Sequence, residues 1–400
     1  MKEQYNLKKI DLVILAGGKG TRIKKLTGKH PKPMVKFNNK HFMQYILNNV
    51  SKYNFRRIII LCGYRYKIFF KKYHNKHINF TKILCVREKK LLGTGGALKN
   101  LKKLKVNDFV LMNGDTLFDI DIKVLINSLD SKKIGINALT KNINQKSNKL
   151  NNLIIKKNIL NIGKKSSFMN GGVYFFKKKL FNYIKIKNFS LENDVLPKLI
   201  KKKLINGISF NSFFLDIGSK YYFGLAKKLL IHQYKKPAVF LDRDGVINYD
   251  YGYVHKIKNF KFRPGVLKGL KYLIKKNYYI FIVTNQAGIA KKKFTENNFF
   301  KLHKNIKEKL EKLNIFFNDV QYSPYHPMAK IKKYKKKSTT RKPGNKMITN
   351  IQQIWDINNK KSFMIGDNKT DKLAAKKSKL KYYYAERNFY KQIKSIINNY

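Results

Sequence analysis

Short apolar runs rich in β-branched and aromatic residues alternate with amphipathic segments along the whole chain. Clear examples are Arg57–Cys62, Phe109–Met112, Val239–Leu241, Tyr279–Val283 and Phe363–Ile365. Runs of this length, separated by helical patterns, predict strands of parallel sheets that are covered by helices. We therefore predict an α/β fold, in which ligands bind beyond the carboxyl ends of the strands.

The length and one polar stretch predict two domains. The 400 residues, 43% of them apolar, are enough for two separate cores. The polar stretch His232–Pro237 follows a predicted helix over Tyr221–Leu230 and precedes another apolar run. A boundary there gives domains of residues 1–234 and 235–400. The polar N-terminus and the absence of an apolar run of about 20 residues predict a cytoplasmic protein without a signal peptide or membrane span.

The charge balance is extreme, with 88 basic and 22 acidic residues and a net charge of +66. Such a charge would suit a nucleic-acid partner. However, nearly all the basic residues are lysines spread over every segment, and arginine, the preferred reader of phosphates and base edges, is scarce. We predict no specific nucleic-acid partner, although salt-sensitive binding to polyanions can occur. Cys62 and Cys85, in apolar strand-like settings, are predicted to be buried free thiols.

The scarcity of carboxylates makes those at the ends of predicted strands informative. A solvated surface explains such positions poorly, and chemistry explains them better. The candidates are Asp115, Asp216, Asp242, Asp244 and Asp367.

One apolar run, Leu12–Leu15, leads into a glycine-rich loop with cations, Ala16-Gly17-Gly18-Lys19-Gly20-Thr21-Arg22. Glycines at positions 17, 18 and 20 would let backbone N–H groups approach a triphosphate. Arg22 adds a forked donor for phosphate oxygens, and Lys32, between two prolines, adds a point charge. Although a glycine loop alone can be a simple turn, this combination favours nucleotide binding.

The whole string Leu15–Met34 resembles the signature of the sugar-1-phosphate nucleotidyltransferases. The resemblance continues in the right order over Leu92–Ala97, Val110–Asp115, Asn170–Tyr174, Ser190–Asp194 and Phe214–Gly218. It implies a Rossmann-like, GT-A-like domain with a mixed sheet. It further implies that Gly93 and Gly95 lie against the nucleotide, that Asn170 and Glu192 contact the sugar, and that Asp115 and Asp216 bind Mg²⁺.

Each of these residues also has a structural explanation. Asp115, Asp216 and Asn170 could be turn residues, and Glu192 could complement a helix N-terminus. The chemistry that the resemblance implies is in-line attack by a sugar 1-phosphate oxygen on the α-phosphorus of a nucleoside triphosphate, with pyrophosphate leaving. The protein must then align the reactants and neutralise charge, which Arg22, Lys32 and a carboxylate-held Mg²⁺ can do.

A second apolar run, Ala238–Leu241, leads into a loop of different chemistry, Asp242-Arg243-Asp244-Gly245. Asp242 can attack phosphorus to form an aspartyl-phosphate. Asp244 can protonate the leaving alkoxide and later activate water. Mg²⁺, with Asp242 and Asp244 among its expected ligands, must offset the repulsion between carboxylate and phosphate. Taken alone, this motif could also be a turn or a calcium loop.

Three downstream segments decide between these readings. Ile282–Gln286 ends in a hydroxyl, Thr284, suited to a phosphate oxygen, and Arg341-Lys342-Pro343 places a cation for the transition state. Met364–Asp367 ends another strand in a metal ligand, and Asp371 is either a further ligand or an acid at a helix start. Nucleophile, hydroxyl, lysine and acid in this order resemble the haloacid dehalogenase-like phosphatases, which implies a Rossmannoid parallel sheet. About forty residues separate Asp242 from Thr284, so we predict a minimal cap.

Within that family, four segments together resemble the D-glycero-D-manno-heptose 1,7-bisphosphate phosphatases, and the histidinol-phosphate phosphatases share much of the pattern. The segments are Asn248, Tyr249–Val254, Arg263–Gly265 and Thr284–Ile289. The resemblance implies substrate-binding roles for Asn248, Asn285, Gln286 and Arg341.

One departure from that subfamily concerns metal. Many members carry a structural zinc in a Cys-x-His and Cys-x-Cys loop just before the Arg-Lys-Pro motif. The aligned positions here read Ser323-Pro324-Tyr325 and Ser338-Thr339-Thr340, and His326 alone cannot make a tetrahedral site. We predict Mg²⁺ at both sites, no zinc, and a loose exposed loop over Lys330–Lys337.

The two resemblances converge on one pathway. Removal of the 7-phosphate from a heptose 1,7-bisphosphate gives a heptose 1-phosphate, and the N-terminal half looks most like the heptose 1-phosphate guanylyltransferases. The hypothesis is a bifunctional enzyme that makes GDP-D-glycero-α-D-manno-heptose for surface polysaccharide. One alternative is a hexose 1-phosphate nucleotidyltransferase fused to a histidinol-phosphate-like phosphatase. Another is a polyanion-binding protein with relict enzyme domains.

Overall fold

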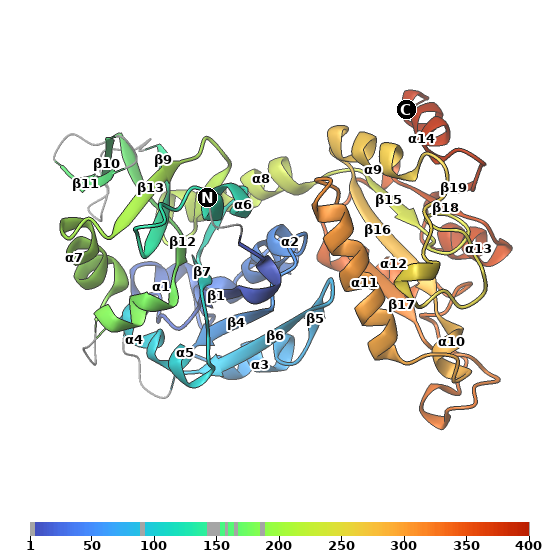
Figure 1. Ribbon diagram of the computed structural model, residues 1–400, viewed down its shortest axis with the longest axis horizontal. Coiled ribbons are helices and arrows are strands. Elements are labelled where there is room, and N and C mark those ends of the chain that lie inside the picture. The colour runs from blue at the N-terminus through green and yellow to red at the C-terminus, as the bar shows by residue number, and fades with distance from the viewer. Residues whose placement is uncertain are drawn as a thin grey trace. The chain divides into compact units, whose positions relative to one another are not determined.

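The computed structural model describes residues 5–88, 93–141, 153–156, 159–163, 167–184 and 189–399, without the side chains of Arg22 and Lys156. The chain forms two compact units. The first unit extends to Leu229, and the second extends from Leu230 and also includes the short segment Val50–Asn54. Figure 1 shows helices on a central sheet in each unit.

The first unit is built on a mixed sheet. Its strands in the described residues follow the order β10 (Leu153–Lys156), β11 (Ile159–Ile162), β13 (Ile205–Ser209), β9 (Gly135–Lys141), β12 (Phe168–Phe176), β7 (Phe109–Asn113), β1 (Asp11–Leu15), β4 (Arg57–Cys62), β6 (Thr81–Arg87) and β5 (His77–Ile78). β1 pairs in parallel with β4 and β7, and β4 with β6. β12 runs antiparallel to both β7 and β9. The parallel arrangement expected from the apolar runs therefore holds around β1, and the mixed sheet implied by the family resemblance is confirmed.

Two small strand pairs accompany this sheet, β2 (Lys36–Phe37) with β3 (Lys40–His41) and β8 (Thr116–Phe118) with β14 (Phe214–Asp216). The helices among the described residues of the unit are α1 (Lys24–Thr27), α2 (Phe42–Val50), α3 (Tyr66–Tyr73), α4 (Gly93–Ala97), α5 (Lys99–Lys103), α6 (Ile122–Asn127), α7 (Leu196–Lys201) and α8 (Lys220–Tyr234). The last residue of α2 and the residues of α8 from Leu230 on belong to the second unit. Short 3-10 turns cover Leu7–Lys9, Thr21–Ile23, Lys32–Met34 and Lys178–Tyr183, and a π-helical turn covers Leu191–Val195. The helix predicted over Tyr221–Leu230 is α8, and it continues to Tyr234.

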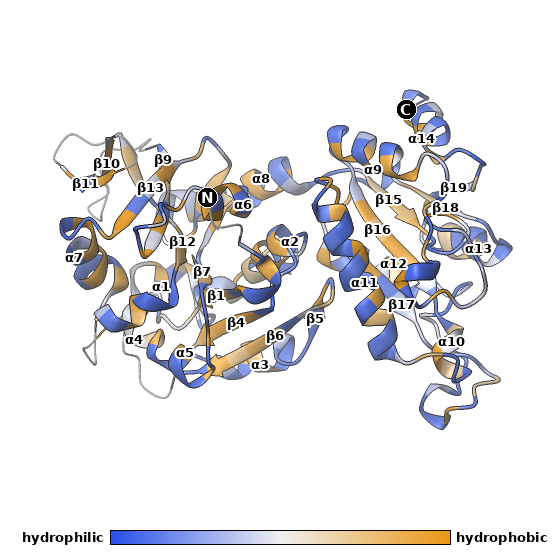
Figure 2. Cartoon of the chain, in the orientation of Figure 1, coloured by the Kyte–Doolittle hydropathy of each residue, from blue (hydrophilic) through white to orange (hydrophobic). Residues whose placement is uncertain are grey.

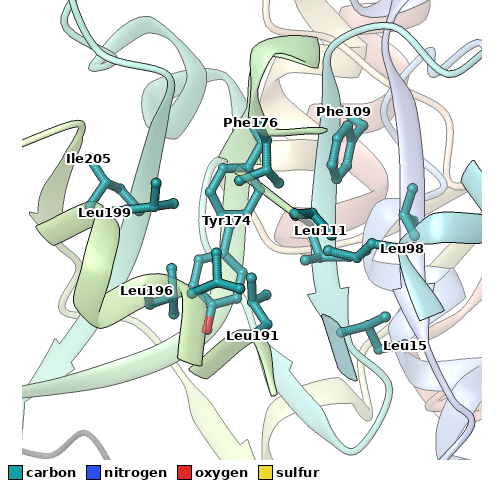
Figure 3. Close-up of a cluster of buried hydrophobic side chains, with 14 of the residues drawn as sticks. Leu15, Leu98, Phe109, Leu111, Tyr174, Phe176, Leu191, Leu196, Leu199 and Ile205 are labelled. Atoms are coloured by element: carbon teal, nitrogen blue, oxygen red, sulfur yellow. The ribbon is translucent and has the colours of Figure 1, made fainter. Parts of the chain in front are cut away.

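One core cluster of the first unit lies between β12, β7 and the segment formed by the π-helical turn and α7. Tyr174 and Phe176, two positions apart on β12, share one face of the sheet and stack with ring centroids 5.5 Å apart. They pack with apolar side chains from β7, from α7 and from the π-helical turn, as Figure 3 shows for Leu111, Leu196 and Leu191. This packing fixes the π-helical turn, which carries Glu192, against the central strands.

The second unit is built on a five-stranded sheet in which all neighbouring strands are parallel. Its order is β17 (Asp319–Ser323), β16 (Tyr279–Asn285), β15 (Ala238–Leu241), β18 (Phe363–Gly366) and β19 (Lys381–Tyr384). The helices are α9 (Val266–Lys275), α10 (Ala287–Ala290), α11 (Glu296–Glu311), α12 (Lys346–Ile354), α13 (Lys369–Lys377) and α14 (Phe389–Asn398), with 3-10 turns at Ile257–Asn259, Lys332–Tyr334 and Asn359–Lys361. Leu241 pairs with both Ile282 and Ile365. The residues that follow β15, β16 and β18 therefore emerge at one edge of the sheet.

In the core of the second unit, apolar side chains at alternate positions of the strands pack against the apolar faces of helices. Phe240 and Phe281 pack with Trp355 and with side chains of α12 and α13. Strands β4 and β16 are coloured mainly hydrophobic in Figure 2, as expected for strands covered on both faces. Residues 242–278, which join β15 to β16, contain one 3-10 turn and α9. The minimal cap is thus confirmed.

Cys62 on β4 and Cys85 on β6 are free and buried, as predicted. Among the described residues, no helix combines the length and apolar character that crossing a bilayer requires.

Candidate active sites

The glycine-rich loop of the first unit follows β1. Gly20 has a φ of +65°, a conformation that favours glycine, and a side chain there would meet the methylene groups of Lys32. A side chain at Gly17 would collide with the carboxylate of Glu88, whereas Gly18 faces open space. Arg22, predicted to bind phosphate, has its backbone in the turn Thr21–Ile23, and its side chain lies outside the described part.

Lys32, Asp115 and Asp216 converge from three separate segments. The Lys32 Nζ lies 2.9 Å from Asp115 Oδ2, and Asp216 Oδ1 accepts a hydrogen bond of 2.7 Å from the amide of Gly218. A methyl group at Gly218 would lie 2.9 Å from Asp216 Oδ1, 3.1 Å from Lys32 Nζ and 3.4 Å from Asp115 Oδ2. The pairing of β14 with β8 places Asp216 opposite Thr116, the neighbour of Asp115. The two acids proposed for metal binding therefore face one point, together with a lysine.

The second glycine loop is joined to the π-helical turn. Thr94 Oγ1 donates to Glu192 Oε2 over 2.7 Å and accepts from the amide of Leu191. The amide of Gly95 donates to the carbonyl of Phe189, and Gly93, at φ +74°, has no room for a side chain beside that carbonyl. Glu192 also lies in the first turn of its helical segment, so both sequence explanations for it are compatible with its position.

Asn170 shapes a β-bulge in β12. The register with β9 shifts between Asn170 and Val173, where Gly172 adopts a φ of +69°. Asn170 Oδ1 accepts from the amide of Gly172 over 3.0 Å, and its amide group donates to the hydroxyl of Tyr174. Both hydrogen bonds stabilise the bulge, so Asn170 has a structural role, and contact with a sugar would be a second role.

Glu88 is a residue of this site that the sequence analysis missed. It follows β6, is buried, and donates its backbone amide to the carbonyl of Cys62 at the end of β4. Its carboxyl group lies against Gly17, and burial raises its pKa to about 7. The available signal was an acid directly after a predicted strand, the same signal that singled out Asp115.

In the second unit, Asp244 is held by three donors. The guanidinium of Arg243 binds both carboxylate oxygens, with Nη2 2.7 Å from Oδ2. Asn248 Nδ2 donates to Oδ1 over 2.9 Å, and Gln286 Nε2 donates to Oδ2 over 3.1 Å. Gln286 also donates to Thr284 Oγ1 over 3.0 Å. Two residues predicted to bind substrate therefore orient the proposed acid–base carboxylate.

Arg243 is the second residue whose importance the sequence analysis missed. Arg243 lies between Asp242 and Asp244 in the sequence, and its side chain is fully buried. Its guanidinium also donates to the carbonyl of Val254 over 2.8 Å. The ring of His303 lies 3.5 Å away, and burial together with the Arg243 charge holds the pKa of His303 well below its usual value. Arg243 thus fixes Asp244 with the forked geometry that suits a carboxylate.

Lys342 lies between two carboxylates. Its Nζ is 2.9 Å from Asp242 Oδ1 and 2.6 Å from Asp371 Oδ1. Burial raises the pKa of Asp242 to about 7, and the Lys342 charge opposes that rise. Burial alone would lower the pKa of Lys342, yet the two carboxylates raise it above its ordinary value. The lysine therefore remains charged in a buried position.

Three acids of this unit can bind one metal ion. Ligand oxygens of Asp242, Asp367 and Asp371 all lie within 4.8 Å of one another. Asp371 also caps α13, because the amide of Asn368 donates to its Oδ2 over 3.1 Å. Asp244, predicted as a metal ligand, has its carboxylate engaged as described above and is not in this group. The donor set, hard oxygens from three carboxylates, suits Mg²⁺.

The segment before Lys342 is more closely bonded than expected. The lysines of Lys330–Lys337 are exposed, as predicted, but Tyr334 is buried and donates to Glu296 Oε2 over 2.7 Å. Tyr322 donates to the other oxygen of Glu296 over 2.8 Å. Arg341 is half-buried, and its Nη1 is a buried donor without a hydrogen-bond partner in the described residues. The loop is therefore anchored at its tip, and Arg341 remains available to an anion.

Comparisons with known proteins match each half of the chain to a protein family. Residues 12–233 match the family described as nucleotidyl transferase, and because this is more than half of the chain, the chain belongs to that family. Residues 241–395 match the family described as polynucleotide kinase 3 phosphatase. The chain is thus an enzyme with a nucleotidyltransferase domain and a phosphatase domain.

Individual relatives are similar to each half of the chain and have more specific names than the two families. D-glycero-alpha-D-manno-heptose 1-phosphate guanylyltransferase of Campylobacter jejuni is 34% identical over 211 residues, which are 52% of this chain and 93% of the relative. D-glycero-beta-D-manno-heptose-1,7-bisphosphate 7-phosphatase of Photorhabdus laumondii is 42% identical over 144 residues, 36% of this chain and 77% of the relative. The crystal structure of HddC from Yersinia pseudotuberculosis is 30% identical, covers 55% of this chain and 98% of that chain, and has a TM-score of 0.46. The family resemblances noted in the sequence are confirmed.

Proposed function

We propose that the chain is a bifunctional enzyme of nucleotide-activated heptose synthesis. Its second unit removes the 7-phosphate of D-glycero-D-manno-heptose 1,7-bisphosphate, and its first unit transfers a guanylyl group from GTP to the resulting heptose 1-phosphate. One observation carries this proposal. The relatives of the two halves are a 7-phosphatase named for the β-anomer of the bisphosphate and a guanylyltransferase named for the α-anomer of the 1-phosphate. Removal of the 7-phosphate leaves C1 unchanged, so the first reaction supplies the acceptor of the second when the phosphatase of this chain takes the α-anomer.

The residues of the second unit support phosphate-ester hydrolysis. Asp242 attacks the phosphorus, and an aspartyl-phosphate forms as the sugar oxygen leaves. Asp244 gives that oxygen a proton and afterwards takes one from the attacking water, while Arg243 and Gln286 hold its carboxylate in place. Lys342 balances the charge on the phosphoryl oxygens, and the hydroxyl of Thr284 donates a hydrogen bond to one of them. Asp242, Asp367 and Asp371 would hold Mg²⁺, which when bound offsets the negative charge of phosphate and carboxylates.

The residues of the first unit support nucleotidyl transfer. The loop of Gly17, Gly18 and Gly20 offers backbone amides to the triphosphate, and Lys32 and Arg22 add positive charge for the leaving pyrophosphate. Asp115 and Asp216 converge beside Gly218 and would hold the second Mg²⁺. The acceptor would lie near Asn170 and Glu192. Its 1-phosphate oxygen attacks the α-phosphorus, and the phosphorus–oxygen bond to pyrophosphate breaks.

Glu88 favours guanine as the base. Its carboxylate lies against the first glycine of the nucleotide loop at the end of a central strand. Guanine presents two adjacent donors, N1–H and the N2 amino group, which one carboxylate can accept together. Adenine, cytosine and uracil lack that pair of neighbouring donors. A carboxylate at this place therefore suits GTP better than the other nucleoside triphosphates.

The test supplies heptose 1,7-bisphosphate and GTP to the purified chain and measures phosphate and pyrophosphate. We expect phosphate release without GTP, and pyrophosphate release only when GTP is added. Asp242→Asn should abolish phosphate release yet retain pyrophosphate release from heptose 1-phosphate, whereas Asp115→Asn should do the reverse. Turnover with another triphosphate and none with GTP would refute the guanylyl assignment, and turnover of hexose 1-phosphates but not of heptose 1-phosphate would refute the sugar.

A further inference from the structure

Three hydroxyl groups gather between β17 and the Arg341–Lys342 segment. We call Ser323, Ser338 and Thr340 the hydroxyl cluster. Thr340 Oγ1 lies 3.1 Å from Ser323 Oγ and 2.8 Å from Ser338 Oγ, and the amide of Thr340 donates to Ser338 Oγ over 3.3 Å. Ser323 is fully buried at the end of β17, and the other two are half-buried. The cluster therefore ties a loop residue to the rigid end of a strand.

The hydroxyl cluster lies next to the bonds that hold the backbone of Lys342. Asn285 accepts from the amide of Lys342 over 3.0 Å and donates to its carbonyl over 3.1 Å. Asn285 ends β16 and pairs in register with Ser323, whose carbonyl accepts from the amide of Gln286. The loop is thus fastened to the ends of two adjacent strands, at Thr340 and again at Lys342.

The Lys342 ammonium occupies a narrowly defined position, so the backbone that carries it must be held in place. It reaches Asp242 and Asp371 at once, in a site where the lysine side chain is 2% exposed. The chain just before it, Lys330–Lys337, carries several exposed lysines whose mutual repulsion favours spreading of the loop. A hold between that segment and Lys342 keeps such spreading from displacing the ammonium.

We propose that the hydroxyl cluster positions Lys342 for phosphate hydrolysis, an inference that rests on the proposed role of Lys342. Ser323, Ser338 and Thr340 act as positioning residues, since none of them needs to touch substrate. A misplacement of about 1 Å in a group that acts on the transition state can cost roughly a hundredfold in rate. Loss of one hydroxyl should therefore reduce turnover without weakening substrate binding.

The test compares four variants of the full chain with p-nitrophenyl phosphate and Mg²⁺, so that it does not depend on the sugar. Thr340→Val removes the hydroxyl at nearly constant shape, Thr340→Ser keeps it, and Ser338→Ala removes a neighbouring hydroxyl. Thr339→Val is the matched control, because Thr339 is exposed and its hydroxyl belongs to none of the bonds of the cluster. We expect kcat to fall about tenfold or more in Thr340→Val and Ser338→Ala with KM changed less than about twofold. Thr340→Ser and Thr339→Val should stay close to the unaltered chain.

Several outcomes would overturn the inference. A wild-type kcat in Thr340→Val would remove it, and so would an equal fall in Thr340→Ser, since packing and not the hydroxyl would then be responsible. A rise in KM at unchanged kcat would assign the cluster to substrate binding instead. If Thr340→Val does not fold, Ser338→Ala gives the same comparison. An unaltered chain that hydrolyses no phosphate ester would instead refute the proposed function itself.

Discussion

Lys342 and Asp371 form a buried ion pair, with Nζ 2.6 Å from Oδ1 and exposed side-chain fractions of 2% and 1%. They come from a loop and from the first turn of α13, which follow different strands of one parallel sheet. The pair sits beside Asp242, so the proposed nucleophile shares its counter-ion with a second acid. The two buried carboxylates, Asp242 and Asp371, are stable side by side only while the lysine, a metal ion or both balance their negative charge.

Asp371→Asn should therefore destabilise the metal-free second unit. Breaking a buried ion pair typically costs about 3–5 kcal/mol when the remaining charge has no other partner. The cost here should be smaller, because Asp242 still lies 2.9 Å from the Lys342 ammonium. The measurement is urea unfolding in EDTA, followed by a probe of the second unit such as the fluorescence of Trp355, the only tryptophan of the chain. Glu386→Gln, which removes an exposed carboxylate of the same unit, serves as the control. Equal unfolding midpoints for the two variants would contradict the importance of the pair.

Lys32→Met should impair nucleotidyl transfer selectively. Lys32 is the cation beside Asp115 and over Gly20, and removal of one preorganised charge from such a site costs roughly a hundredfold or more in turnover. Phosphate release by the second unit should be unchanged. The control is Lys36→Met, four residues further on and exposed on β2. Similar pyrophosphate release by the two variants would show that charge in general, and not Lys32, is used.

The positions at strand ends were the predictable part of both sites. Leu15 and Leu241 end apolar runs, and parallel pairing brings the residues after neighbouring strands to one edge. Contacts made by long side chains were not predictable in the same way. Arg243 turns back onto its neighbour Asp244, and His303 and Phe299 of α11, about 60 residues further along the chain, lie beside its guanidinium.

Some residues proved to have partners that spacing does not reveal. Asn285 and Gln286 were assigned to substrate from a resemblance, yet their amide groups hold Lys342 and Asp244. Glu88 was passed over because its partner, Gly17, has no side chain to suggest a contact. The anchoring of Tyr334 on Glu296 depends on a helix start 38 residues earlier, which a count of lysines in the loop cannot show.

Mg²⁺ alone should restore phosphatase activity after complete removal of metals. The three acids near Asp242 suit a hard cation, whereas the positions aligned with a zinc loop carry the hydroxyls of Ser323, Ser338 and Thr340. Hydroxyl groups without thiolates or imidazoles make a poor zinc site. The checks are elemental analysis of the purified chain and activity after chelation and dialysis into MgCl₂. Stoichiometric zinc, or activity that returns only when zinc is added, would contradict this prediction.

Glu88 should make the use of GTP depend on pH. Burial raises its pKa to about 7, so below that pH the free protein holds a proton on the carboxyl group. Only the ionised form can accept both N1–H and the N2 amino group of guanine, and binding below the pKa must therefore expel that proton. The KM for GTP should fall about tenfold for each pH unit up to about pH 7 and then level off.

Glu88→Gln should flatten this dependence and reduce the preference for GTP over UTP, because a glutamine presents one acceptor and one donor where guanine needs two acceptors. Initial rates of pyrophosphate release at a series of pH values, with both triphosphates, provide the measurement. A KM for GTP that stays constant between about pH 6 and pH 8 in the unaltered chain would remove Glu88 from the base site.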